Sequence, residues 1–81
     1  MPLVLKRSQN RIKNGWESRS AIMRIAAHGH SPEVADRNLE RVARMFFTSL
    51  EREGRLEQEA RRVGIETEGE GGELQVLLIE G

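Results

Sequence analysis

The stretch Lys13-Asn14-Gly15-Trp16 decides how the chain begins to fold. Asn-Gly is the strongest short hairpin signal, because a type I′ turn needs a positive φ at both central residues. We therefore predict a tight turn at Asn14-Gly15. It joins a strand that runs from Leu3 toward Ile12 to a returning strand over Trp16–Ser20.

A second stretch, His28-Gly29-His30-Ser31-Pro32-Glu33, marks the start of a helix. Ser31 supplies a hydroxyl cap, Pro32 occupies the first helical position and Glu33 places an acid in the first turn. Before it lies a short apolar run, Ala21–Ala27, whose isoleucines favour a strand and whose alanines also suit a helix. Periodicity does not settle so short a run. We predict a third strand there and keep the helix as the alternative.

An apolar repeat with helical spacing runs from Pro32 to about Glu53. One stripe of side chains is predicted to face the sheet, and flanking residues widen it. The stripe is Ala35, Leu39, Val42, Phe46 and Leu50, flanked by Val34, Ala43 and Phe47. Gly54 fits the stop of this helix. A short second helix is predicted over Arg55–Val63, ended by Gly64.

The C-terminal end reads as a polar turn, Glu66–Gly72, and a last strand, Glu73–Glu80. Alternation places Leu74, Val76 and Leu78 on one face of that strand and Leu77 and Ile79 on the other. Two apolar faces suit a strand that is buried on both sides. The predicted fold is α+β in the order β-β-β-α-β. It has a three-stranded N-terminal sheet, a long helix packed on one face and a C-terminal strand, in a single domain over residues 1–81.

The composition excludes several classes of protein. The 81 residues include no cysteine, which rules out a disulfide, a thiolate nucleophile and a cysteine-ligated zinc. No apolar run approaches the ~20 residues of a membrane span, and no signal peptide opens the sequence. We expect a cytoplasmic protein that makes no contact with a membrane.

The net charge of zero hides an asymmetry. Residues 1–30 hold six bases and one acid, whereas residues 64–81 hold five acids and no base. This pattern fits a basic nucleic-acid face with an acidic tail. It also fits two segments that pack together and neutralise each other, which is the interpretation we favour. Trp16, the one aromatic residue in the basic segment, is either a cross-strand packing residue or an exposed interface anchor.

No pattern in the chain predicts catalysis or a bound cofactor. His28 and His30 would share a face of a strand, but Glu33 is the only further ligand nearby, so we expect no metal site. A nuclease of the ribonuclease H type needs carboxylates on its central strands, and the hairpin offers only Glu17. A nucleophilic serine needs a base and an orienting group, whereas Ser18, Ser20 and Ser31 have structural explanations, Ser31 as the helix cap. The acidic loop Gly69–Gly72 would repel phosphate.

The segment Gly29–Leu39 resembles the HicB antitoxin family. The matching positions are Gly29, Ser31, Glu33, Ala35, Asn38 and Leu39, and Gly15-Trp16 resembles the step that opens the family's second strand. Ala21–Ala27 stands where the family usually carries prolines, and Val34 replaces the family's second acid. The order of elements is similar to the family's partial ribonuclease H-like domain.

The resemblance implies a non-catalytic antitoxin-like module that masks a small HicA-like, RNA-cleaving toxin by protein–protein contact. It names no partner-binding residues on this chain, and we expect no DNA-binding module after Ile79. The alternative is a small helix-turn-helix-like DNA-binding protein, with Ala21–Ala27 as its first helix and the helix from Pro32 as its recognition helix. We expect a homo-oligomer, most simply a dimer, because a chain this small gains stability by association.

Overall fold

A computed structural model describes residues 1–67 and 73–81. The chain opens with a hairpin of β1 (Pro2–Ile12) and β2 (Gly15–Ser20), paired antiparallel from Ser8↔Arg19 to Ile12↔Gly15. The two-residue loop is therefore Lys13-Asn14, and Asn14 has a φ of 68°. The predicted type I′ turn at Asn14-Gly15 is wrong by one residue. Asparagine tolerates this left-handed conformation, so it serves as the second loop residue.

Gly15 is required for a different reason. A Cβ at this position would lie 2.5 Å from the carbonyl oxygen of Gly29. The glycine thus lets the start of β2 approach the end of β3 (Ile25–Gly29), which pairs antiparallel with β2.

The run Ala21–Ala27 divides between a turn and a strand. Residues 21–24 form a turn in which Arg24 has a φ of 56°, and β3 begins at Ile25. The hydroxyl of Ser20 accepts a hydrogen bond from the Met23 N–H at 3.2 Å, which folds the backbone out of the strand. The predicted strand is thus correct in type but begins too early. The helix that the DNA-binding alternative requires is not formed.

The helix α1 spans Pro32–Arg52, close to its prediction. The Ser31 hydroxyl accepts a hydrogen bond from the Val34 N–H at 3.2 Å, which confirms the predicted cap. Gly54, with a φ of 70°, follows the helix end, as expected of a left-handed stop. The short helix α2 spans Leu56–Val63 and ends at Gly64.

The buried face of α1 is rotated from the predicted stripe. Its buried residues are Ala35, Leu39, Ala43, Phe47 and Leu50. Val42 and Phe46, both predicted to face the core, are 41% and 50% exposed. The two alanines of the buried row allow the helix to approach the sheet closely, which leaves the parallel row of larger side chains on its flank.

Two further strands pair with β1. β4 (Glu66–Thr67) is antiparallel to it at Leu3↔Thr67 and Val4↔Glu66. β5 (Gln75–Glu80) is parallel to it from Pro2↔Gln75 to Arg7↔Glu80. A parallel return needs a long crossover, which the helices supply. The predicted C-terminal strand is confirmed but begins at Gln75. Of the predicted turn, residues 66–67 form β4, and residues 68–72 lie outside the described residues.

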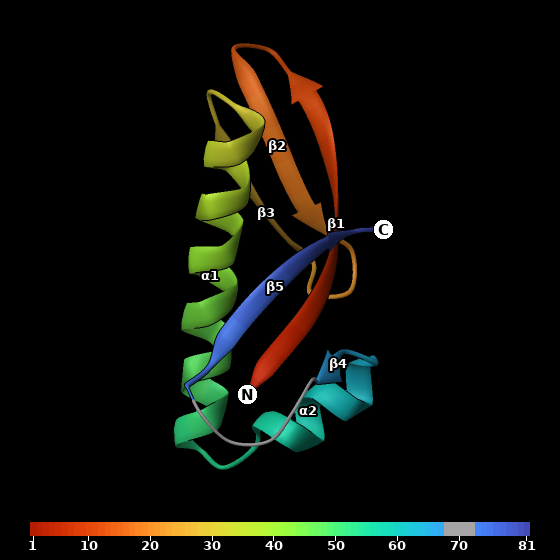
Figure 1. The fold of residues 1–81 in the computed structure, drawn as a ribbon, viewed down its shortest axis with the longest axis vertical. Coiled ribbons are helices and arrows are strands. Elements are labelled where there is room, and N and C mark those ends of the chain that lie inside the picture. The colour runs from red at the N-terminus through yellow and green to blue at the C-terminus, as the bar shows by residue number, and fades with distance from the viewer. Residues whose placement is uncertain (68–72) are drawn as a thin grey trace.

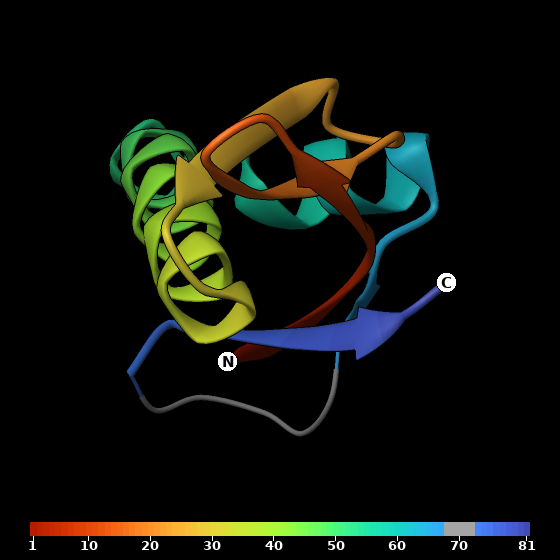
Figure 2. The same cartoon turned by 90° about the horizontal axis from the view of Figure 1, so that it is seen from above.

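The helix α1 covers one face of the twisted sheet, and α2 lies beneath the N-terminal end of β1 (Figures 1 and 2). The core between them is formed by Leu3, Leu5, Ala43, Phe47, Leu50, Leu56, Ala60, Ile65 and Val76. On the other face of β5, Leu77 is 40% exposed and Ile79 is 42% exposed. The prediction that this strand is buried on both sides is therefore wrong. No helix among the described residues is long and apolar enough to span a membrane.

Candidate protein-binding surface

The residues that carry the family resemblance hold α1 against β3. A Cβ on Gly29 would lie 2.5 Å from the backbone nitrogen of Ala35, so only glycine permits this approach. The Asn38 side chain donates to the carbonyl of His28 at 2.7 Å. Ala35 and Leu39 are fully buried. This part of the motif therefore has a structural explanation and does not by itself define a binding site.

A polar cluster that the sequence analysis missed lies between the sheet and the N-terminal part of α1. The Asp36 carboxylate accepts hydrogen bonds from Arg7 Nε and Nη2, both at 2.9 Å. Its Oδ1 also accepts from the Ser18 hydroxyl at 2.6 Å and from Gln9 Nε2 at 3.1 Å. The sequence pattern that could have revealed this cluster is the alternation of residues along β1. It places Arg7 and Gln9 on the same face as the buried Leu3 and Leu5.

The cluster keeps Asp36 ionised. Burial raises the pKa of Asp36. The hydrogen bonds from Arg7, Ser18 and Gln9, together with the Arg7 charge, lower this pKa by more than burial raises it. The net effect is a pKa below the ordinary aspartate value. Because both carboxylate oxygens already accept hydrogen bonds from these three side chains, Asp36 serves to fasten α1 to β1 and β2.

The two histidines do not converge on a metal site. His30 lies beyond the end of β3, so it does not share a strand face with His28 as predicted. His28 Nε2 lies 3.2 Å from the Glu17 carboxylate. Hydrogen bonds from Arg19 and His28 lower the pKa of Glu17. Among residues 1–67 and 73–81 no group of three or more His, Cys, Asp or Glu side chains is placed to hold a metal.

The opposite charges of the chain ends meet at one point. Arg7 Nη1 lies 3.4 Å from the Glu80 carboxylate, across the parallel pairing of β1 and β5. This ion pair joins the basic N-terminal segment to the acidic C-terminal segment, as the interpretation that the two segments pack together expects. Trp16 is half-buried, and the Arg11 guanidinium lies 5.7 Å from its ring centre, which fits the cross-strand packing interpretation.

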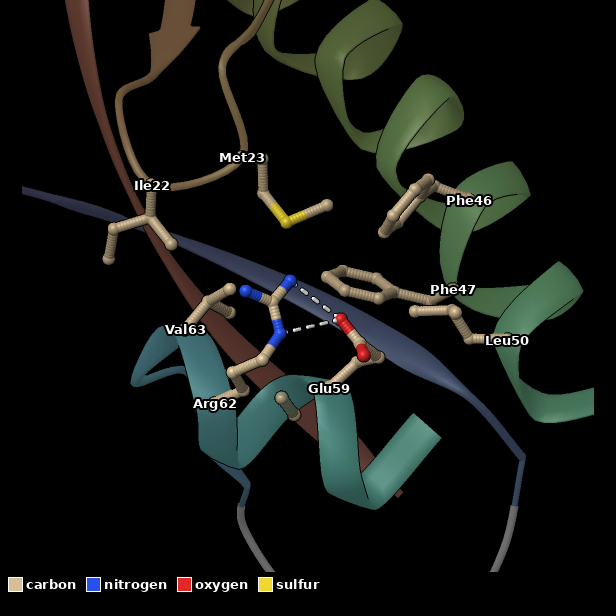
Figure 3. Close-up of a pocket in the computed structure, with 9 residues that line it drawn as sticks. Ile22, Met23, Phe46, Phe47, Leu50, Glu59, Arg62 and Val63 are labelled. Atoms are coloured by element: carbon tan, nitrogen blue, oxygen red, sulfur yellow. Dashed lines mark hydrogen bonds and ion pairs between the residues drawn. The ribbon is translucent and has the colours of Figure 1, made fainter. Parts of the chain in front are cut away.

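The clearest candidate for a binding site is an apolar groove where α1, α2 and the turn before β3 meet (Figure 3). It encloses about 120 Å³. Its lining residues are Ile22, Met23, Phe46, Phe47, Leu50, Glu59, Ala60, Arg62 and Val63. Figure 3 shows Met23 and the two phenylalanines pointing into the space between the elements.

An exposed apolar strip on α1 continues from this groove. Phe46 is 50% exposed at the rim of the groove, and its ring meets Phe47 edge-on with centres 5.9 Å apart. Met45 is 67% exposed, and Val42 lies one helical turn before Phe46. We call Val42, Met45 and Phe46 the α1 strip. Sequence reasoning recognised that the apolar stripe was wide but assigned Val42 and Phe46 to the core.

The α2 side of the groove is polar and ordered by ion pairs. Arg62 Nη2 lies 2.7 Å from the Glu59 carboxylate, and Arg55 Nη2 lies 3.4 Å from it. Hydrogen bonds from Arg62 lower the pKa of Glu59, so the carboxylate is ionised at neutral pH. An apolar floor with a charged rim is the usual composition of a protein-binding surface.

Comparisons with protein-family models, curated proteins and solved structures give no match. The HicB resemblance therefore rests on the motif residues and on the order of the elements.

Proposed function

We propose that this protein is a non-catalytic, HicB-like antitoxin module that binds and masks a small HicA-like, RNA-cleaving toxin. The motif resemblance supplies the identity of the partner. The hairpin, strand, helix and parallel last strand agree with the partial ribonuclease H-like order expected for that family. A cytoplasmic location belongs to the same proposal and fits a chain without cysteine.

The observation that carries the proposal is the α1 strip beside the apolar groove. Scattered exposed apolar side chains are ordinary, but aromatic and methionine side chains gathered at one groove are typical of a protein interface. Phe46 and Met45 present the anchors, and the groove of about 120 Å³ accepts one apolar side chain from the toxin. The fold itself does not need these exposed residues, because the core is filled by the neighbouring row.

Masking by contact requires no chemistry from this chain. Asp36 is held by Arg7, Gln9 and Ser18, and His28 faces Glu17, so their polar groups already serve the fold. We therefore expect protein freed of contaminants to cleave no RNA, with or without Mg²⁺ or Zn²⁺. Metal-dependent cleavage that disappears in Asp36→Asn would contradict the proposal.

The binding test begins with the neighbouring reading frame. We expect it to encode a small basic protein that cleaves RNA alone and stops cleaving when this chain is added. Met45→Glu places a charge at the most exposed residue of the α1 strip and should weaken this inhibition at least about tenfold, because burying an unpaired charge is costly.

The matched control is Gln58→Glu, which makes the same charge change at an exposed site on α2. It should inhibit the toxin like the wild type. Equal inhibition by Met45→Glu and Gln58→Glu would show that the toxin binds elsewhere, and a neighbour that never associates would refute the proposed partner.

A further inference from the structure

Among the residues that the structure describes, one edge of β5 pairs with no strand. The Gln75 N–H donates to the Met1 carbonyl at 3.2 Å, and the Gly81 N–H donates to the Arg7 carbonyl at 3.1 Å. Because backbone groups alternate in direction along a strand, Val76, Leu78 and Glu80 turn their N–H and C=O groups away from β1. β1 is the only described strand that pairs with β5, and Figure 2 shows β5 at the margin of the sheet.

This edge carries few of the usual protections against strand pairing. Natural edge strands are commonly short, interrupted by proline, or charged on their faces. Between Gln75 and Glu80 the residues of β5 are all apolar. Leu77 and Ile79 are exposed on the face away from α1, where the register places Leu77 beside Val4 and Ile79 beside Lys6.

We propose that a second copy of this chain pairs with the open edge, with the two β5 strands antiparallel and Leu78 opposite Leu78 of the second copy. This register opposes every outward-facing backbone group with its counterpart and forms about six hydrogen bonds. It also places Leu77 against Ile79 of the second copy, and the reverse, so four exposed apolar side chains cover one another. The result is one sheet that continues through both protomers.

Space and charge at the edge suit this occupant. A groove of about 380 Å³ separates β5 from α1 and is lined by Glu33, Asp36, Arg37, Glu40, Val76, Leu77 and Leu78. The side chains of the second strand enter this groove. Two of the three acids in this lining are already paired, Asp36 with Arg7 and Glu40 with Arg44. Arg37 therefore remains for Glu80 of the second copy, which lies opposite Val76 in the proposed register. An acid thus approaches a base at each end of the paired strands.

The pairing uses a surface separate from the α1 strip, so it does not depend on the proposed toxin. Sedimentation equilibrium of the full chain at tens of micromolar should give twice the 9.2 kDa chain mass. The double variant Leu77→Lys, Ile79→Lys sets lysines against lysines and should sediment as a monomer with an unchanged far-ultraviolet circular dichroism spectrum. The variant Leu77→Lys, Ile79→Glu places opposite charges across the interface and should recover the dimer.

The control is Val42→Lys, Met45→Lys, which makes the same two kinds of change on α1 and should remain dimeric. A wild-type chain that sediments as a monomer would overturn the proposal. A Leu77→Lys, Ile79→Lys variant that remains dimeric would also overturn it. The same holds if the control variant Val42→Lys, Met45→Lys sediments as a monomer. Failure of Leu77→Lys, Ile79→Glu to recover the dimer would refute the antiparallel register. Toxin inhibition, measured separately, reports on the α1 strip.

Discussion

Replacing Gly29 by alanine tests whether the motif works by bringing α1 close to β3. The added Cβ would lie 2.5 Å from the Ala35 nitrogen, 2.7 Å from Val34 Cγ1 and 2.8 Å from the Val34 carbonyl carbon. Two of these atoms belong to the helix backbone, so the cost should reach the upper part of the range for overpacking, about 3 kcal/mol. Alanine loses less conformational entropy than glycine when the strand folds, which offsets about 0.5–1 kcal/mol of this cost. We expect a net loss of about 2 kcal/mol.

Thermal unfolding followed by circular dichroism measures this loss. For a domain of this size about 1 kcal/mol corresponds to 4–8 °C, so the melting temperature should fall by about 8–16 °C. The control is Gly54→Ala, where a Cβ meets no atom within 4 Å and only the φ of 70° is unfavourable. It should cost about 1 kcal/mol. An unchanged or raised melting temperature in Gly29→Ala would refute the close approach.

Two further predictions concern the polar cluster and the hairpin. Asp36→Asn should lower the free energy of unfolding by about 2 kcal/mol at pH 7, less than for a fully buried pair because the aspartate side chain is 26% exposed. Since the folded pKa of Asp36 lies below its ordinary value of 3.8, the wild type loses this stabilisation as the pH falls through that range. Urea titrations should therefore show the difference between wild type and variant shrinking from pH 7 to pH 3, and a constant difference would contradict the ion pair. Gly15→Val should lower the free energy of unfolding by about 1–3 kcal/mol, because its Cβ would meet the Gly29 carbonyl oxygen. As a control, Asn14→Gly should leave the stability unchanged or raise it, since Asn14 already has a positive φ. Equal melting temperatures for Gly15→Val and wild type would disprove the contact.

Signals that act within a few residues predicted the elements well. The Ser31 cap, the proline after it and the glycine stops are local, so α1 and α2 were placed within about a residue of their ends. The hairpin turn was misplaced because Gly15 is required outside the turn. It makes room for the carbonyl of Gly29, which is fourteen residues away in sequence. The start of β3 was missed because the hydrogen bond from Met23 to Ser20 depends on how the turn closes.

The candidate site was harder to predict, since two apolar rows on α1 compete for the core. Ala43 and Phe47 form one row, and Val42 and Phe46 form the other. Hydrophobicity alone favours burial of the row with the larger side chains, Val42 and Phe46. Close packing of the helix on the sheet favours burial of the row that contains Ala43. Which row is left exposed is decided by the fit between helix and sheet, which sequence periodicity does not encode.

A motif built from folding residues predicts a fold more securely than a partner. Gly29, Ala35 and Asn38 are constrained by backbone contacts and burial, so any chain that docks this helix on this strand needs similar residues. Met45 and Leu77 face no such demand, because Met45 is 67% exposed and Leu77 is 40% exposed. Their apolar character thus points to association, and they lie on different elements, α1 and β5. The proposed binding of a toxin and the proposed pairing of two copies are therefore separable by substitution.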